Sequence, residues 1–464
     1  MTKDLYRPPA PMPIGPVMAL MRSLIAGDRD LLALIPKQAY HSTVAPLGYS
    51  RRKIILVNDP AAIRRVMIEE VENFPKSDLM VGSLSPLIND GLFLSAGATW
   101  SRQRAMVDPA FTHMRVNRAF DAMVGAVADI EARWDILSDE GKPLSLEREM
   151  SHLTADIITR TIFSQKLENS VAFEFFDAWA SFQDSVATID LKSLILGKAW
   201  APMKQPPAAQ KAARVIRSHL GQLVDQRMEP EAPKQADIVG DLIAARDPVT
   251  GTGFSREEII DQVGVFFLAG HETTASALTW TFFILSQQPE MVQRLRDEVQ
   301  NAAGSGEISF AVTKKLATAR NVFRDCLRLY PPLGFIPRVS LYDTVIQGVP
   351  TPRGAMVMIS PWIIHRHKEV WEAADRFNPD RFLPDREQAQ PPGAYLPFGL
   401  GPRICIGAAF AMVEAVLIIA RLIRRYEFET LDPQKVRPVS HLATRPATEI
   451  VMHVARRKGV HHEW

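Results

Sequence analysis

The 464-residue chain has few cysteines, almost no net charge and no Gly-x-Gly-x-x-Gly fingerprint. Its two cysteines, Cys326 and Cys405, are too few for a disulfide framework or for the four ligands of an iron–sulfur cluster, and they fit a reducing cytoplasm. A net charge of +2, with Lys and Arg dispersed along the chain, offers no basic patch for nucleic acid. Without the glycine fingerprint, the chain shows no sign of its own dinucleotide or flavin module.

Long apolar runs are also lacking, with one partial exception. Residues 263–285 nearly reach membrane-spanning length, but His271 and Glu272 lie in the middle, where an ionisable pair would be costly in lipid. The N-terminal residues 1–40 are rich in proline, and their apolar patch at 17–21 is too short to cross a bilayer. The sequence therefore predicts a cytoplasmic protein without a transmembrane segment.

The remaining composition, 47% hydrophobic and 23% charged, is typical of a globular protein. Helical periodicity recurs at 114–135, 149–165, 208–228, 255–287 and 407–425. Strand-like pieces are short: 53–57, and a hairpin-like pair made of 344–349 and 355–359. Segments 75–95 and 185–207 lack strong periodicity, which makes them candidates for mobile coverings of a pocket. With no repeat, linker or composition break, we expect one large monomeric domain over 1–464, mainly α with small β-sheets.

The most informative segment is the loop Phe398-Gly-Leu-Gly-Pro-Arg-Ile-Cys-Ile-Gly407, which precedes a mostly apolar helix. Its glycines allow backbone conformations that a side chain would forbid. Cys405 stands at the mouth of the helix, where free N–H groups and the dipole favour thiolate over thiol. Such a thiolate suits a single axial bond to haem iron. A core cysteine after a glycine turn is the plainer alternative.

The spacing Phe-x-x-Gly-x-Arg-x-Cys-x-Gly resembles the haem-binding signature of the cytochrome P450 family. Its specified positions are Phe398, Gly401, Arg403, Cys405 and Gly407. The resemblance implies a haem b (iron protoporphyrin IX) whose axial ligand is Cys405. It also implies cofactor contacts from the rest of the loop, namely Phe398, Gly399, Arg403 and Gly407.

A second motif lies inside a long predicted helix. Ser255 and Glu258 have the spacing of a capping box, and the helix can run from there to Pro289. Midway lies Ala269-Gly-His-Glu-Thr-Thr274. Glycine inside a helix costs roughly 1 kcal/mol relative to alanine, so a flat group pressing on the backbone would explain it. Thr273 can donate to a carbonyl of the previous turn and open the helix locally.

This stretch resembles the family's central-helix motif, Ala/Gly-Gly-x-Asp/Glu-Thr-Thr/Ser. The resemblance implies that Ala269 and Gly270 lie against the haem, that Thr273 stabilises oxygen bound at the iron, and that Glu272 belongs to the proton relay. His271 occupies the unspecified position and is expected to be a packing or surface residue. For the pair alone, a buried threonine beside a solvated glutamate is the alternative.

Asp325 and Arg328 lie three residues apart on one helix face. They resemble the family's Glu-x-x-Arg motif, which a second arginine closes, here Arg381. Aspartate replaces the family's glutamate and is one methylene shorter, which predicts a strained or water-bridged fork. We expect the triad to form nevertheless, as a brace for the cysteine loop; an exposed helix pair is the alternative.

Further arginines are candidates for binding the haem propionates. Trp100 and Arg104 resemble the family's Trp-x-x-x-Arg helix and share one helical face. With Arg338 and Arg403 they would supply enough cations, although any one of them alone could be a solvated surface arginine. His365-Arg366 also fits the family's pattern and is expected only to pack.

The resemblance covers roughly residue 100 to the C-terminal helix. It implies a haem-thiolate monooxygenase that inserts one atom of O₂ into a small hydrophobic substrate. Electrons would come from a separate ferredoxin or flavodoxin-type donor with its reductase, docking near Lys314, Lys315, Arg324 and Arg403. The expected pocket lining is apolar: Val265, Phe266, Leu268, Ala269, residues 333–336 and the turn 441–443. Alternatives are an H₂O₂-driven peroxygenase, a non-catalytic haem-binding protein and a helical scaffold with a buried cysteine.

Overall fold

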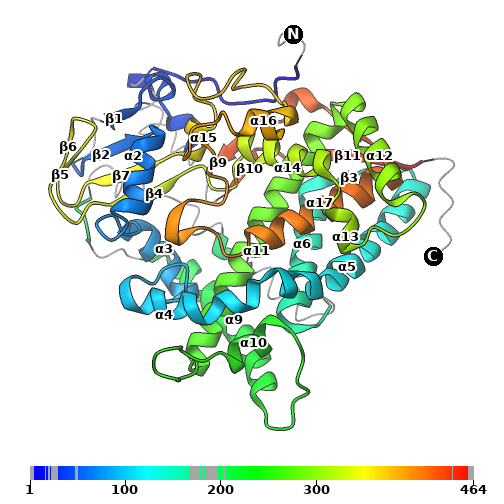
Figure 1. The fold of residues 1–464 in the computed structure, drawn as a ribbon, viewed down its shortest axis with the longest axis horizontal. Coiled ribbons are helices and arrows are strands. Elements are labelled where there is room, and N and C mark those ends of the chain that lie inside the picture. Colours follow the sequence, from blue (N-terminus) through cyan, green and yellow to red (C-terminus); the bar gives the residue numbers. More distant parts are fainter. Residues whose placement is uncertain are drawn as a thin grey trace.

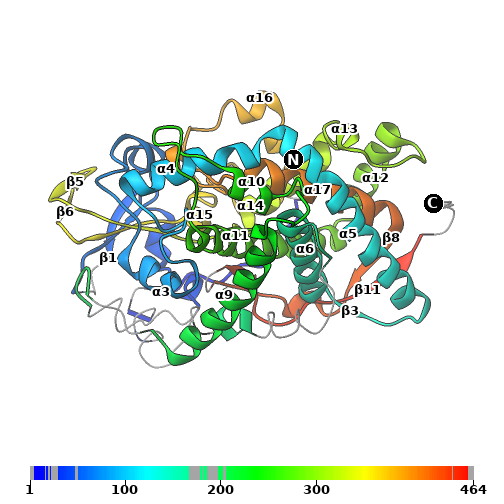
Figure 2. The same ribbon diagram turned by 90° about the horizontal axis from the view of Figure 1, so that it is seen from below.

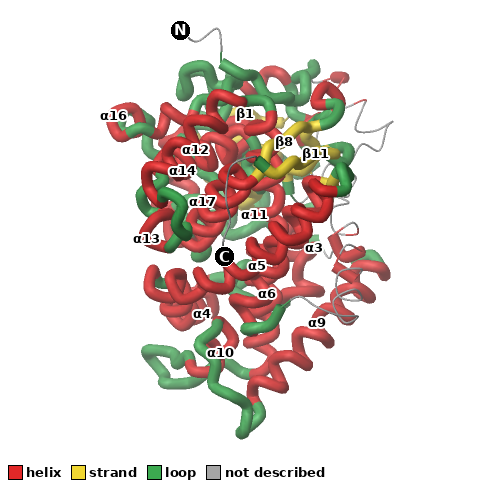
Figure 3. The backbone as a smooth tube through the Cα atoms, turned by 90° about the vertical axis from the view of Figure 1, so that its right-hand side faces the viewer, coloured by secondary structure: helices red, strands yellow, loops and turns green. Residues whose placement is uncertain are grey.

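The computed structural model describes residues 5–15, 17–18, 21, 30–47, 51–166, 178–179, 181–183, 185, 197–201, 205–440 and 443–457. Helices dominate and strands are few and short (Figure 3). The mainly α fold class with small sheets, which the sequence predicts, is confirmed. None of the described helices combines enough length and hydropathy to span a lipid bilayer.

The helices account for most of the described chain. The α-helices are α2 Pro60–Arg64, α3 Asp78–Ile88, α4 Gly97–Val107, α5 His113–Asp139, α6 Leu146–Phe163, α9 Pro207–Met228, α10 Ile238–Ala244, α11 Arg256–Ser286, α12 Pro289–Ala303, α13 Phe310–Thr313, α14 Ala317–Leu329, α15 Pro361–Ile364, α16 Pro384–Glu387 and α17 Ala408–Arg425. Shorter 3₁₀ turns are η1 Leu32–Leu34, η2 Lys37–Tyr40, η4 Asp108–Phe111, η5 Pro379–Phe382, η6 Gly401–Arg403 and η7 Pro433–Lys435, and η3 Arg65–Glu69 is a π-helical turn.

Helix α11 crosses the middle of the molecule (Figures 1 and 2). Its predicted capping box is confirmed: the Glu258 N–H donates to Ser255 Oγ at 3.3 Å, and the Ser255 N–H donates to Glu258 Oε2 at 2.8 Å. The helix ends at Ser286, before Pro289 opens α12. It contributes to two apolar clusters, one around Trp280 with α14 and α17 and one around Phe266 with α3 and α9. The helix therefore runs through both clusters, with its N-terminal half in the second and its C-terminal half in the first.

Within the described ranges, four small sheets accompany the helices. The largest has the order β1 (Val44–Leu47), β2 (Ile54–Val57), β7 (Met356–Ile359), β4 (Ile336–Val339), with β2 and β7 parallel. The others are β3 (Leu144–Ser145), β11 (Val451–Arg456) and β8 (Tyr426–Thr430); β9 (Pro438–Ser440) and β10 (Thr444–Pro446); and β5 (Thr344–Ile346) and β6 (Val349–Thr351). The strand expected at 53–57 is present as β2, fully buried.

The hairpin expected from 344–349 and 355–359 is wrong in its pairing. Strand β5 pairs with β6 across a two-residue turn at Gln347 and Gly348, whose φ angles are 44° and 79°. Positive φ at both central residues is the geometry of a tight hairpin turn, so the chain reverses one strand earlier than expected. Strand β7 then enters the large sheet between β2 and β4.

Helix α3 occupies 78–88 of the first aperiodic segment, 75–95, whereas 89–95 is irregular, and its role as a covering of the pocket stays a prediction. Helix α3 begins after Ser77, whose Oγ accepts the Leu79 N–H at 3.3 Å. Pro86 lies inside α3, and the apolar residues of this helix do not form a clear stripe on one face. The helical period is therefore hard to detect in the sequence. Most of the second segment, 185–207, lies outside the described residues.

The proline-rich N-terminal segment lies along the C-terminal third of the chain. The Tyr330 hydroxyl donates to the Pro9 carbonyl at 2.6 Å, and the Phe377 N–H donates to the Tyr6 carbonyl at 2.9 Å. Arg376 Nη1 donates to the Leu5 carbonyl at 2.6 Å. These bonds attach residues 5–9 to the region that follows α14 and α15.

Candidate active site

The cysteine loop closes on itself and rests on the π-turn η3. The Cys405 N–H donates to the Phe398 carbonyl at 2.9 Å. Gly399 and Gly401 have φ angles of 76° and 74°, which other residues rarely adopt. A Cβ at Gly401 would also collide with the Met67 carbonyl oxygen. The conformational role expected for the loop glycines is therefore present at these two positions.

The Cys405 side chain keeps an uncovered surface at the start of α17. Burial nevertheless raises the pKa of its thiol, while the Gly407 N–H and the Arg104 charge act in the opposite direction. The helix start does favour the thiolate, as expected, through the Gly407 N–H, but desolvation outweighs it in the protein alone. A bound metal ion changes this balance, since it deprotonates a coordinating thiol outright.

Three cations gather without an acidic partner in the described chain. Lys76 and Arg338 form an isolated antiparallel bridge, flanked by the Ser77 N–H bond to the Pro337 carbonyl (3.2 Å), so their side chains leave on the same side. Arg338 is 4% exposed, and its Nε has no hydrogen-bond partner. Arg403 donates from Nη1 to the Ser95 carbonyl at 2.8 Å.

Burial and mutual repulsion act on all three cations, and Glu72 offsets them only in part, at Arg403. Burial lowers the pKa of Lys76 well below its usual range, and the charges of Arg338 and Arg403 add to the effect. Burial and Arg403 lower the pKa of Arg338 to about 10. Burial is also the main cause that lowers the pKa of Arg403 to about 10. A ligand with two carboxylates would relieve this repulsion, so the cluster fits a haem with its two propionates.

The sequence offers no signal for Lys76, which is a single lysine outside any motif. Its ammonium lies 3.6 Å from the centroid of the Phe93 ring and donates to the Phe93 carbonyl. Trp100 and Arg403 do meet: the guanidinium lies 4.1 Å from the indole ring centroid. Arg104 instead donates to the Ile404 carbonyl at 3.0 Å and pairs with Asp108 at 2.6 Å. Arg104 thus holds the cysteine loop from outside.

Helix α11 exposes one residue in its middle. Ala269 is accessible although its neighbour Leu268 is only 8% exposed, and it accepts the Thr273 hydroxyl at 2.5 Å. This is the back-bond expected for Thr273. Gly270 has another reason to lack a side chain, because a Cβ there would lie 2.8 Å from Ile158 Cδ1 on α6. The contact of Gly270 with a cofactor stays a prediction.

The two acid–base residues of the motif are both desolvated. Burial raises the pKa of Glu272, opposed by the Arg445 charge and a hydrogen bond to Gln183. His271 is 4% exposed, and burial lowers its pKa to about 4. Its Nε2 lies 2.7 Å from Ser151 Oγ, so it joins α11 to α6 as a packing residue.

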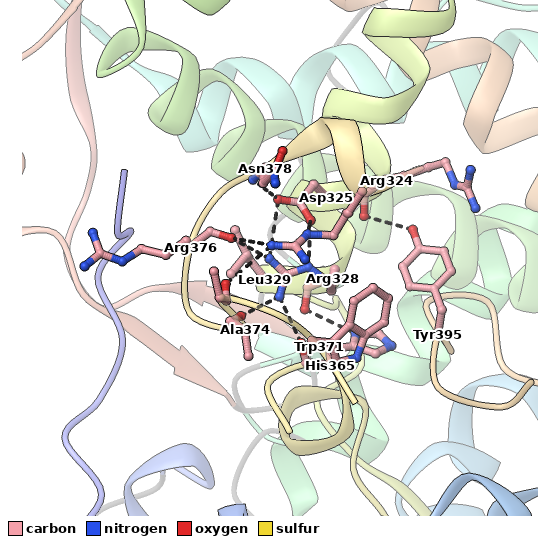
Figure 4. Close-up of polar contacts among 12 residues, drawn as sticks. Arg324, Asp325, Arg328, Leu329, His365, Trp371, Ala374, Arg376, Asn378 and Tyr395 are labelled. Carbon is pink, nitrogen blue, oxygen red and sulfur yellow. Dashed lines mark hydrogen bonds and ion pairs between the residues drawn. The ribbon is translucent and has the colours of Figure 1, made fainter. Parts of the chain in front are cut away.

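The structure brings the three members of the triad together, and Figure 4 shows two of them, Asp325 and Arg328. Arg328 Nε lies 2.6 Å and Arg381 Nε 3.0 Å from Asp325 Oδ1. The other oxygen, Oδ2, accepts the Asn378 N–H at 2.6 Å. Both arginines reach the shorter acid directly, so the aspartate needs no bridging water. Arg328 also donates to the carbonyls of His365, Ala374 and Arg376, at 2.9, 2.5 and 2.7 Å.

His365 does more than pack, which the sequence did not indicate. Its Nε2 accepts the Leu396 N–H at 2.7 Å, and its Nδ1 lies 3.2 Å from the Arg328 carbonyl (Figure 4 shows the second contact). Leu396 precedes Phe398 by two residues. The imidazole therefore connects the triad to the beginning of the cysteine loop.

No group of three or more His, Cys, Asp or Glu side chains within the described ranges could hold a metal ion. A metal carried by a porphyrin needs only one protein ligand, and Cys405 meets that need. The uncovered thiol, the three cations and the accessible Ala269 are together consistent with a haem.

Comparisons with known proteins agree with this geometry. A family model described as "Cytochrome P450" matches residues 34–454. "Cyclooctatin synthase" of Streptomyces melanosporofaciens is 30% identical over 425 residues, covering 89% of this chain and 90% of its own. "Cyclooctat-9-en-7-ol 5-monooxygenase" of the same organism is 29% identical over 417 residues, covering 89% and 87%. The "Crystal structure of cytochrome P450DA heme domain" has a TM-score of 0.79 at 22% identity and 90% coverage of both chains, a likeness of fold.

Proposed function

Since this chain belongs to the cytochrome P450 family and is a haem-thiolate monooxygenase, we propose that it hydroxylates a small, uncharged, apolar molecule with electrons from a separate redox protein. The observation that carries the proposal is the uncovered Cys405 thiol near a cluster of three unpaired cations. When bound, haem supplies the chemistry that places one atom of O₂ in the substrate and the other in water.

The residues of this chain hold the cofactor and handle protons. Cys405 would hold the haem iron through its sulfur, and Lys76, Arg338 and Arg403 would bind the haem carboxylates. The Thr273 hydroxyl, which donates to the Ala269 carbonyl, would be a proton donor at this point of the pocket once it turned away from that carbonyl. The Glu272 carboxyl would pass protons to this hydroxyl, because burial raises its pKa and so favours its protonated form more than in an exposed glutamate.

The expected lining of the substrate pocket is apolar in the described chain. Val265, Phe266 and Leu268 are 4–8% exposed on α11, and Leu333, Phe335 and Ile336 are half-buried. Of the expected turn 441–443, residues 441–442 lie outside the described residues. Without a cation in this lining, an uncharged substrate is favoured over a carboxylate. One relative's printed name contains a cyclic unsaturated alcohol, which makes a terpenoid-like substrate our first choice among terpenoids, steroids, fatty acids and aromatics.

The electron donor requires a docking face near Cys405, and the residues expected there need revision. Arg403 turns inward to the Ser95 carbonyl, and Arg324 pairs with Glu387. Lys314 and Lys315 are exposed beside α13, which packs on α17. Figure 2 shows α4, α13 and α17 on one side of α11 and α3 and α9 on the other. We place the acidic donor on the α13–α17 side, where both lysines can steer it.

The decisive test compares the two cysteines. Cys405→Ala should lose the spectrum of a thiolate-bound reduced haem with carbon monoxide, whereas the matched control Cys326→Ala, at a buried site, should keep it. Thr273→Ala should raise the NAD(P)H consumed per product formed. A rate of peroxide-driven turnover that is the same in Thr273→Ala and in the parent would favour a peroxygenase. A pigment that yields no oxygenated product would favour a haem-binding protein without catalysis.

The single domain, the monomeric state and the cytoplasmic location stay predictions.

A further inference from the structure

Residues 89–96 connect α3 to α4 and touch the cofactor cations. The Phe93 carbonyl accepts from Lys76, and the Ser95 carbonyl accepts from Arg403 at 2.8 Å. On the other side, the Leu92 N–H donates to Gln262 Oε1 of α11 at 3.0 Å. This connecting segment therefore lies between α11 and the cations that hold the cofactor.

The connecting segment also lies flush against α11. A Cβ at Gly91 would be 2.8 Å from Val265 Cγ2 and 3.1 Å from the Asp261 carbonyl oxygen. Val265 belongs to the expected pocket lining. Any separation of the segment from α11 would therefore open the wall beside that lining.

A buried carboxylate fixes the first residue of the segment. Asn89 has a φ of 36°, unusual for a residue other than glycine, and its Nδ2 donates to Asp261 Oδ1 at 3.1 Å. Asp261 is 8% exposed on α11. Arg217 of α9 donates from Nη1 to the same Oδ1 at 2.6 Å and to the Leu87 carbonyl, at the end of α3, at 2.9 Å. We call Asn89, Arg217 and Asp261 the latch.

The latch joins α3, α9 and α11 through one charged group. Figure 2 shows α3 and α9 together on one side of α11. The positive charge of Arg217 stabilises the ionised Asp261 carboxylate, whereas burial opposes it and is the larger effect. If Arg217 moves away, the Asp261 carboxylate loses its compensating charge. The bond that stabilises the positive φ angle of Asn89 is then weakened as well.

We propose that Asp261 and Arg217 are positioning residues that hold residues 89–96 against α11 and thereby limit how fast bulky molecules reach the pocket. The inference rests on the proposed haem site. Movement of α9 away from α11 would pull Arg217 from Asp261 and from the Leu87 carbonyl together, freeing the end of α3 and the segment in one step.

The test measures access with two probes of different size. Stopped-flow absorbance follows binding of 4-phenylimidazole, a bulky ligand of haem iron, and of carbon monoxide to the reduced protein. Asp261→Asn preserves shape and removes the charge; Arg217→Gln removes the partner. In both variants 4-phenylimidazole should associate roughly tenfold faster, the value of one hydrogen bond to a charged group, with carbon monoxide unchanged.

Glu257→Gln is the matched control, because Glu257 also pairs with Arg217, at 3.1 Å, but is 65% exposed and outside the latch. Its rates should equal those of the parent. Arg217→Lys should recover part of the restriction, since lysine keeps the positive charge on a shorter side chain. Unchanged 4-phenylimidazole rates in both latch variants, or equal acceleration of both probes, would overturn the proposal. A protein without haem would instead refute the proposed function, because no binding signal would exist.

Discussion

Acid should destabilise this protein through His365, and one substitution isolates the effect. The side chain is fully buried, and burial together with Arg328 and Arg366 lowers its pKa well below the usual value. Because the Leu396 N–H can only donate, Nε2 must accept and stay unprotonated, which leaves the proton on Nδ1. A second proton would break the bond that ties Leu396 to the triad.

Proton linkage gives the sign and the size of this pH effect on the free energy of unfolding. Below a pH of about 6.5 the unfolded chain binds a proton at this histidine and the folded chain does not, so the free energy of unfolding falls as pH falls. One such group contributes about 1.4 kcal/mol per pH unit, or about 2 kcal/mol between pH 6.5 and 5. His271, whose pKa burial lowers to about 4, adds a similar loss over the same range.

His365→Gln should remove the contribution of this histidine to the slope of the free energy of unfolding against pH. A glutamine amide can accept from Leu396 and donate to the Arg328 carbonyl, but it does not titrate. The measurement is urea-induced unfolding, followed by tryptophan fluorescence at several values between pH 7 and 5. We expect the variant to be less stable at pH 7 by about 1–2 kcal/mol, from lost packing, and to lose less stability on acidification. His113→Gln, at an exposed histidine, is the control. An unaltered slope in His365→Gln would refute the reasoning.

Three further predictions concern the same site. Lys76→Gln should speed haem transfer to apomyoglobin roughly tenfold, because one charge-assisted contact to a carboxylate is lost, and an unchanged rate would remove Lys76 from the cluster. Asp325→Glu should destabilise the fold by about 1–3 kcal/mol in chemical denaturation, since the added methylene overfills a fully buried site, even though the family has glutamate there. Gly270→Ala should also destabilise, with Ile158→Ala restoring part of the loss; additive effects in that double-mutant cycle would contradict the contact.

Local patterns in the sequence predict the local features of the site. The spacing of Ser255 and Glu258 predicts the start of α11, and the glycines at 399 and 401 predict backbone that only glycine adopts easily. In both cases the physical cause lies within a few residues of the pattern. The predicted hairpin was wrong at this same local scale, because Gly348 can be interpreted from the sequence either as a strand residue or as a turn residue.

Features made by distant segments were not predictable in this way. Lys76 meets Arg338 only because two segments more than 250 residues apart form a bridge. The direction of the Cys405 pKa depends on burial by the whole fold, which outweighs the local helix end. His365 gains its role from Leu396, thirty-one residues later. None of these three effects follows from the spacing of residues within one segment, even where the residue itself belongs to a motif.

The attachment of residues 5–9 near Tyr330 and Arg376 has a consequence for synthesis on the ribosome. The segment is synthesised some 320–370 residues before the groups that bind it. Strand β2 likewise waits for β7. Such long sequence separations slow the final assembly and leave apolar surface uncovered meanwhile. The nascent chain should therefore depend on chaperones until its last third has emerged.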